Sequence, residues 1–111
     1  MTGPGEGTRS SPRITVRHIE GCPHTDLMVR RVRRALSDLG DPDAPIDLEV
    51  VGDADDAVRT AFAGSPTLLI DGRDPFPHTG MAGGLACRVY PTPAGPEGAP
   101  TIEQLRQVLS R

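Results

Sequence analysis

Residues 13–39 read RITVRHIEGCPHTDLMVRRVRRALSDL, which predicts a strand, a tight turn and a helix in direct succession. In residues 13–20, β-branched residues fall on both alternating faces, a pattern typical of a strand that is covered on both sides. The helix begins at about Pro23 or His24, because proline suits a first helical position, and an apolar stripe with helical spacing follows. The turn that joins the two elements carries Cys22.

The rest of the chain continues this alternation of strands and helices, with turns rich in glycine and proline between them. We expect, in order, a strand over 46–51, a short helix from Asp53 to Phe62, a strand over 67–70, a long loop over 73–84, a strand over 85–90, an extended connector over 91–100 and a last helix opened by Thr101. The element order βαβαββα predicts one α/β domain over 13–111. Residues 1–12 form a flexible tail, because their composition buries too little apolar surface to become ordered.

Composition excludes several classes of function. The chain of 111 residues carries 12 basic and 15 acidic side chains, a net charge of −3, whereas a nucleic-acid-binding surface needs excess positive charge. No run approaches the roughly 20 apolar residues of a membrane span. All basic residues are arginine, so a lysine Schiff base is excluded. Two cysteines without an apolar leader favour the cytoplasm. We expect no nucleic-acid or membrane partner and no cofactor, and the oligomeric state stays open.

Cys22 stands where a thiol has a physical reason to be reactive. It follows a strand and lies at the first turn of a helix, where unpaired amides and the helix dipole stabilise a thiolate. His24 adds positive charge, as does Arg17 or His18 at the end of the strand, and Gly21 leaves room for a partner. The alternative is that Cys22 is a small buried hydrophobic residue, as free cysteines often are.

Ser65, Pro66 and Thr67 come directly before an apolar strand. A cis bond between Ser65 and Pro66 would present the flanking backbone groups to a docked peptide. We predict that this bond is cis and that Pro66 lies beside Cys22. Because only about 5% of X–Pro bonds in folded proteins are cis, the alternative is an ordinary turn before an edge strand.

Taken together, the strand, the Gly-Cys-Pro-x-Thr turn, the long helix and the Ser-Pro-Thr loop resemble the thioredoxin-like superfamily, over about residues 13–111. The resemblance implies a four-stranded mixed sheet in the spatial order 2-1-3-4, flanked by helices. It implies that Cys22 is the attacking cysteine of a thiol–disulfide oxidoreductase and that Pro66 is the cis-proline beside it. It also implies that the substrate is a disulfide-containing protein or a small thiol, bound by residues that flank these two: Gly21, Pro23, His24, Ser65 and Thr67.

Two residues depart from the thioredoxin pattern. Thr25 stands where thioredoxins have a resolving cysteine, and Gly21 stands where they have a tryptophan. We therefore expect a monothiol enzyme, whose mixed disulfide persists until another thiol releases it. Thr25 either caps the helix or hydrogen-bonds the thiolate. Cys87 is the only other candidate to resolve Cys22, but it shares a strand face with Val89, which favours a buried structural residue that is less reactive than a partly exposed Cys22.

A second family supplies an alternative chemistry. Residues 85–90 bear a faint similarity to the cysteine strand of organomercurial lyases, which cleave a carbon–mercury bond with two thiols and a carboxylate. Cys22, Cys87 and Asp26 would be the matching groups in this sequence.

The sequence leaves two further alternatives open, a metal site and a binding module. Cys22 with His24 and His18 would form a soft-metal site, but this loose spacing is less specific than paired CxxC motifs, and we expect no metal. The chain would also serve as a non-catalytic binding module with an inert cysteine. The arginine run over 30–34 indicates a solvated helix face or, by the same charge, a surface for an acidic partner.

Overall fold

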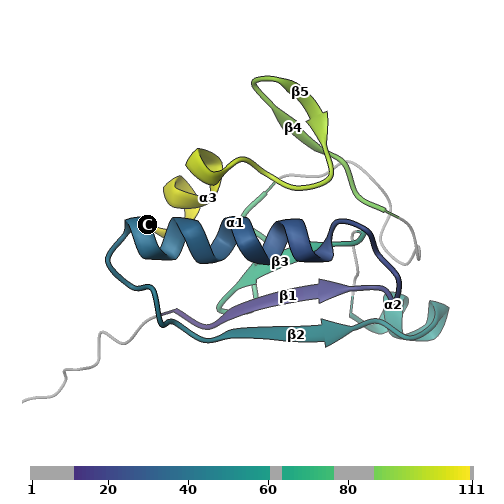
Figure 1. Ribbon diagram of the computed structural model, residues 1–111. Helices are drawn as coiled ribbons and strands as arrows, with labels where there is room; N and C mark the ends of the chain where they lie inside the picture. The colour runs from purple at the N-terminus through teal and green to yellow at the C-terminus, as the bar shows by residue number, and fades with distance from the viewer. Residues whose placement is uncertain (1–11, 61–63, 77–86, 111) are drawn as a thin grey trace, which may run out of the picture.

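The computed structural model describes residues 12–60, 64–76 and 87–110, and Figure 1 shows their arrangement. The elements are, in chain order, β1 (Ile14–His18), α1 (Thr25–Asp38), β2 (Ile46–Val50), α2 (Ala54–Arg59), β3 (Thr67–Ile70), β4 (Tyr90–Thr92), β5 (Gly95–Glu97) and α3 (Ile102–Leu109). The predicted α/β class is confirmed. Of the predicted tail, only Pro12 falls within the described residues. None of the described helices is long and apolar enough to cross a membrane.

Strand β1 is the central strand of a three-stranded mixed sheet with the order β2-β1-β3. It runs parallel to β2, with Ile14 opposite Ile46, and α1 makes the crossover connection that parallel strands require. It runs antiparallel to β3, with Ile14 opposite Ile70. The carboxyl ends of β1 and β2 therefore meet at one edge of the sheet, where the turn that carries Cys22 begins.

Helices α1 and α3 pack on the sheet and on each other, as Figure 1 shows. Four of the five residues of the apolar stripe predicted for α1 are buried: Met28, Val32, Ala35 and Leu36. The fifth, Leu39, is the C-cap residue and is 41% exposed. The four buried residues pack with buried residues of the sheet and of α3, among them Ile14, Val16, Leu68, Leu105 and Val108. Because burying one large aliphatic side chain contributes about 1.5–3 kcal/mol, this core fixes the start of α1 over the end of β1.

The predicted fourth strand over 85–90, and with it the sheet order 2-1-3-4, is wrong for the residues that the structure describes; the first two residues of that segment lie outside them. Cys87 forms only an isolated parallel bridge with Ser65. Strand pairing begins at Tyr90, where β4 forms a hairpin with β5 in the segment predicted as a connector. The reason is the burial of Tyr90, whose ring packs edge-on against Phe76 with 5.6 Å between the ring centroids.

The observed ends of α1 and α2 differ in part from the predicted ones. Helix α1 begins at Thr25, so Pro23 is not its first helical residue, and the N-cap residue His24 makes no capping hydrogen bond with its side chain. Asp53 caps α2 as predicted, by accepting a hydrogen bond from the amide of Asp56 at 2.8 Å. Within the described residues α2 ends at Arg59, and the predicted end at residue 62 lies outside them.

Two arginines of the run on α1 make contacts within the chain instead of forming a solvated face. Arg31 Nη1 donates to the carbonyl oxygens of Ala99 and Pro100, at 3.2 and 2.9 Å. The same nitrogen lies 3.0 Å from Oε1 of Glu97. Arg33 donates to two carbonyl oxygens of the loop before β2. The run therefore attaches the segment after β5 and the loop before β2 to α1.

Candidate functional site

Cys22 lies in two consecutive tight turns between β1 and α1. Its amide donates to the carbonyl oxygen of Ile19 at 3.3 Å, and the amide of Thr25 donates to the carbonyl oxygen of Cys22 at 3.4 Å. Gly21 has φ of +73°, a left-handed conformation that glycine adopts without strain. Gly21 and Pro23 are exposed, and Cys22 between them is half-buried, as predicted, but it lies in the turn before α1 and not in the first turn of the helix.

The bond between Ser65 and Pro66 is cis, which confirms the prediction. Ser65 Oγ accepts a hydrogen bond from the amide of Ile19 at 3.1 Å, and the same hydroxyl lowers the pKa of the Cys22 thiol. The proline loop therefore contacts the turn that carries Cys22, and Ser65 makes this contact; that Pro66 itself lies beside Cys22 stays a prediction. Ser65, Pro66 and Thr67 are all buried.

The surroundings of Cys22 favour its thiolate. Burial raises the pKa of this thiol, but the hydrogen bonds that it receives outweigh burial, so the pKa lies below the ordinary value of 9.0. The groups that lower this pKa are the hydroxyls of Ser65 and Thr25 and the backbone amides of His24 and Thr25. Hydrogen bonds to a charged form favour that form, and here they come from two loops that are distant in sequence.

The structure decides against one of the two roles predicted for Thr25. It does not cap α1, because the N-cap residue is His24. Its Oγ1 is buried and makes no hydrogen bond within the described part of the chain, although its hydroxyl is among the groups that lower the pKa of Cys22. A hydrogen bond from Thr25 to the thiolate therefore stays a prediction.

The structure places Arg17 and His18 in other contacts than the one predicted with the thiol. The guanidinium of Arg17 pairs with Glu49 and donates to the carbonyl oxygen of Thr60 at 3.2 Å. His18 Nδ1 lies 3.0 Å from the carbonyl oxygen of Ile19. The stabilisation of the thiolate comes from neutral donors instead.

The ring of His24 packs against the segment that follows β5. A Cβ atom added to Gly98 would lie 2.3 Å from Cγ of His24, so only glycine fits there. Nδ1 of His24 is buried and has no hydrogen-bond partner among the residues described. His24 thus serves the thiol through its backbone amide, while its side chain attaches the hairpin to the cysteine turn.

Cys87 is exposed, so the prediction of a buried strand residue is wrong. Val89 on the same side of the segment is 62% exposed, whereas Arg88 and Tyr90 are only 6% and 2% exposed. Alternation in the sequence indicated two faces, and the face that is buried is the one that carries the charged residue. Cys87 pairs with Ser65 in the parallel bridge, and the amide of Arg88 donates to the carbonyl oxygen of Ser65 at 2.8 Å.

Two residues that the sequence analysis missed support the proline loop. Tyr90 donates from its hydroxyl to the carbonyl oxygen of Pro66, and burial raises the pKa of this phenol well above its usual range. The guanidinium of Arg88 lies 4.5 Å from the centroid of the Tyr90 ring and donates to Asp74 Oδ2 at 2.7 Å. The only signal in the sequence was the alternation of these two residues with the more apolar ones.

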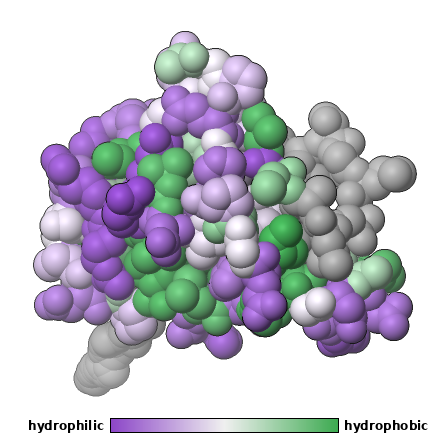
Figure 2. Space-filling model, turned by 45° about the vertical axis from the view of Figure 1, so that its right-hand side comes forward, coloured by the Kyte–Doolittle hydropathy of each residue, from purple (hydrophilic) through white to green (hydrophobic). Residues whose placement is uncertain are grey.

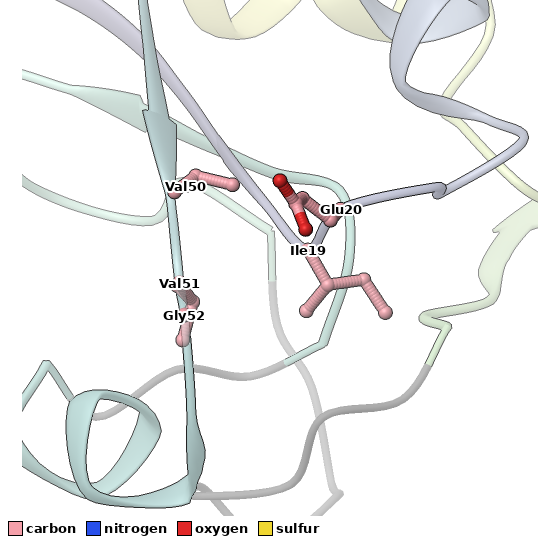
Figure 3. A pocket seen from close by; sticks show the side chains of 5 residues that line it. All are labelled: Ile19, Glu20, Val50, Val51 and Gly52. Atoms are coloured by element: carbon pink, nitrogen blue, oxygen red, sulfur yellow. The ribbon is translucent and has the colours of Figure 1, made fainter.

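A hollow of about 360 Å³ lies at the carboxyl ends of β1 and β2, beside the cysteine turn. Figure 3 shows the side chains that line it: Ile19, Glu20, Val50, Val51 and Gly52. Nearby on β2, Leu48 is 58% exposed, and Figure 2 shows hydrophobic side chains that reach the surface between hydrophilic ones. Except for Glu20, the lining of the hollow is apolar. The hollow therefore suits an aliphatic side chain of a binding partner.

The described residues contain no cluster of three or more His, Cys, Asp or Glu side chains that could hold a metal ion. The soft-metal alternative on Cys22, His18 and His24 therefore gains no support.

No protein-family model, curated protein or solved structure matches the chain. The function is therefore argued from the site itself.

Proposed function

We propose that this chain is a thioredoxin-like thiol–disulfide oxidoreductase in which Cys22 is the nucleophile. The observation that carries the proposal is the meeting of two loops: Ser65, next to a cis-proline, accepts a hydrogen bond from the Ile19 amide in the turn that carries Cys22, just before α1, and lowers the pKa of that thiol. The strand order β2-β1-β3 agrees with three of the four strands that the resemblance implies. The hairpin β4–β5 forms a sheet of its own and does not extend this one.

The reaction begins with the thiolate of Cys22. It attacks one sulfur of a substrate disulfide, so that a bond forms between Cys22 Sγ and that sulfur while the substrate disulfide breaks. The departing thiolate takes a proton from solvent. Because the hydroxyls of Ser65 and Thr25 lower the pKa of Cys22, more of this thiol is ionised at neutral pH than in a free cysteine.

The exposed part of the turn is where the substrate binds. Gly21 and Pro23 flank the thiol, and the hollow beside them receives an apolar side chain of the disulfide substrate. Ser65 and Thr67 are 0% and 3% exposed and Pro66 is fully buried, so we assign them to the support of the thiol. The substrate is a disulfide-containing protein or a small disulfide.

The test is to incubate the reduced protein with oxidised glutathione and to locate adducts by peptide mass. We expect Cys22 to be oxidised, either as its glutathione adduct or as a disulfide that replaces the adduct, and Cys22→Ser should form neither at this position. Alkylation of the wild type at neutral pH should label Cys22 faster than Cys87, because hydrogen-bond donors lower the pKa of the Cys22 thiol. If Cys22 is not oxidised and is alkylated with the pH profile of a free thiol, the chain is a binding module with an inert cysteine.

Disulfide exchange is favoured over carbon–mercury cleavage by the groups around the thiol. Hydroxyls and amides lower the pKa of Cys22, whereas Asp26 is an exposed residue in the first turn of α1. Release of an alkane from an organomercurial by the wild type, and its loss in Asp26→Asn, would favour the lyase chemistry instead.

A further inference from the structure

Ser65 adjoins both the turn that carries Cys22 and Cys87 itself. Its hydroxyl accepts a hydrogen bond from the Ile19 amide, in the turn that carries Cys22, and lowers the pKa of that thiol. Its backbone pairs with Cys87 in the parallel bridge, and paired residues of neighbouring strands lie about 4.8 Å apart. Opposite residues of such a pair share one face, so the side chain of Cys87 extends to the same side of this bridge as the Ser65 hydroxyl.

We propose that Cys87 is the resolving cysteine for Cys22, an inference that rests on the proposed function. Once Cys22 carries a mixed disulfide, the thiolate of Cys87 attacks Cys22 Sγ. A disulfide forms between Cys22 and Cys87, the mixed disulfide breaks, and the second half of the substrate leaves as a thiolate that is protonated from solvent. An external thiol reductant then reduces this disulfide, so that both cysteines regain their protons and the reductant becomes a disulfide.

The attachment of Cys87 leaves it free to approach Cys22. A disulfide requires Cα atoms within about 7 Å of each other. Among the described residues the bridge between Cys87 and Ser65 is isolated, and Val89 beyond it is exposed, so within them a shift of Cys87 disrupts one bridge and no strand ladder. The anchor is the next residue, because the buried side chain of Arg88 donates to Asp74 at 2.7 Å.

Two features of the site fit a resolving thiol at this place. Thr25 occupies the position of the resolving cysteine in the thioredoxin pattern, so the first turn of α1 holds no second thiol. Cys87 is exposed, so the disulfide that it forms is open to an external reductant. Exposed disulfides are the labile and catalytic ones.

The test uses oxidised glutathione as the substrate and compares the wild type with Cys87→Ser. We expect the wild type to release both halves of the glutathione and to yield a peptide in which Cys22 is linked to Cys87 of the same chain. Cys87→Ser should instead retain glutathione on Cys22. Val89→Ser is the matched control, because it changes an exposed neighbour and keeps both thiols, and it should behave as the wild type.

The outcomes separate this inference from the proposed function. A wild type that retains glutathione on Cys22 while Cys87 stays free overturns the role of Cys87, as does a disulfide that forms only between two chains. If Cys87→Ser takes no glutathione, the proposed function fails. Oxidation of the wild type with diamide then decides whether the two thiols pair: a linked peptide supports the pairing, and two free thiols overturn it.

Discussion

Replacing Ser65 with alanine removes the hydroxyl that serves both the Cys22 thiol and the Ile19 amide. A hydrogen bond to a charged group contributes about 1.5–3 kcal/mol, and about 1.4 kcal/mol is a factor of ten. The fraction of thiolate at neutral pH should therefore fall about ten- to hundredfold. A more basic thiolate is also more nucleophilic, with a Brønsted slope of about 0.4–0.5, which offsets nearly half of this loss on a logarithmic scale. We expect alkylation of Cys22 to slow about three- to tenfold.

The assay is the rate of alkylation of Cys22 by iodoacetamide as a function of pH, read by peptide mass. The midpoint of the profile should move to higher pH in Ser65→Ala. Ser37→Ala is the matched control, because it removes an exposed serine of α1 and should leave the profile unchanged. Ser65→Ala also leaves the Ile19 amide without its acceptor, which costs about 1–3 kcal/mol of unfolding free energy. Urea denaturation must therefore first show that Ser65→Ala is folded. A folded Ser65→Ala with the rate and midpoint of the wild type would refute the reasoning.

Three further changes test other contacts. Tyr90→Phe leaves the carbonyl oxygen of the cis-proline without its donor and should lower the free energy of unfolding by about 1–3 kcal/mol in urea; no change would mean that water replaces the phenol. Gly98→Ala forces a methyl group into the His24 ring and should cost about 1–3 kcal/mol in the same measurement, and a stability equal to the wild type would contradict the contact. Because the pKa of Cys22 is lower in the folded protein than its ordinary value of 9.0, its thiolate stabilises the fold, fully above that value and less as pH falls through the folded pKa. The unfolding free energy of the wild type relative to Cys22→Ser should therefore rise with pH up to about 9.0, and a difference that is independent of pH would contradict this.

Patterns between near neighbours predicted the elements that depend on near neighbours. The apolar stripe of α1, the Asp53 cap and the strand Thr67–Ile70 follow from spacing, propensity and capping. The cis bond at Pro66 and the contact of its loop with Cys22 followed from the order of the motifs along the chain. The order of the motifs could be compared with that of the thioredoxin-like superfamily, whereas each motif alone is only weak evidence for a cis bond or for a contact.

The exposure of Cys87 could not be predicted in this way. Alternation shows that a segment has two faces, and the choice between them depends on what covers each face. Charged residues usually face solvent, so Arg88 argued for the wrong face. Its burial depends on Asp74 and on the ring of Tyr90, and no pattern in the sequence links these residues.

The donors to the Cys22 thiol come from two parts of the chain that are made at different times. Domains fold during synthesis from the N-terminus onward, so a growing chain contains Cys22 and the residues of α1 before it contains Ser65. Until β3 pairs with β1, the thiol has only the local donors of its own turn. Its full acidity therefore arrives only with the completed sheet, and a ribosome-bound chain carries at Cys22 a thiol of more ordinary acidity than that of the finished protein.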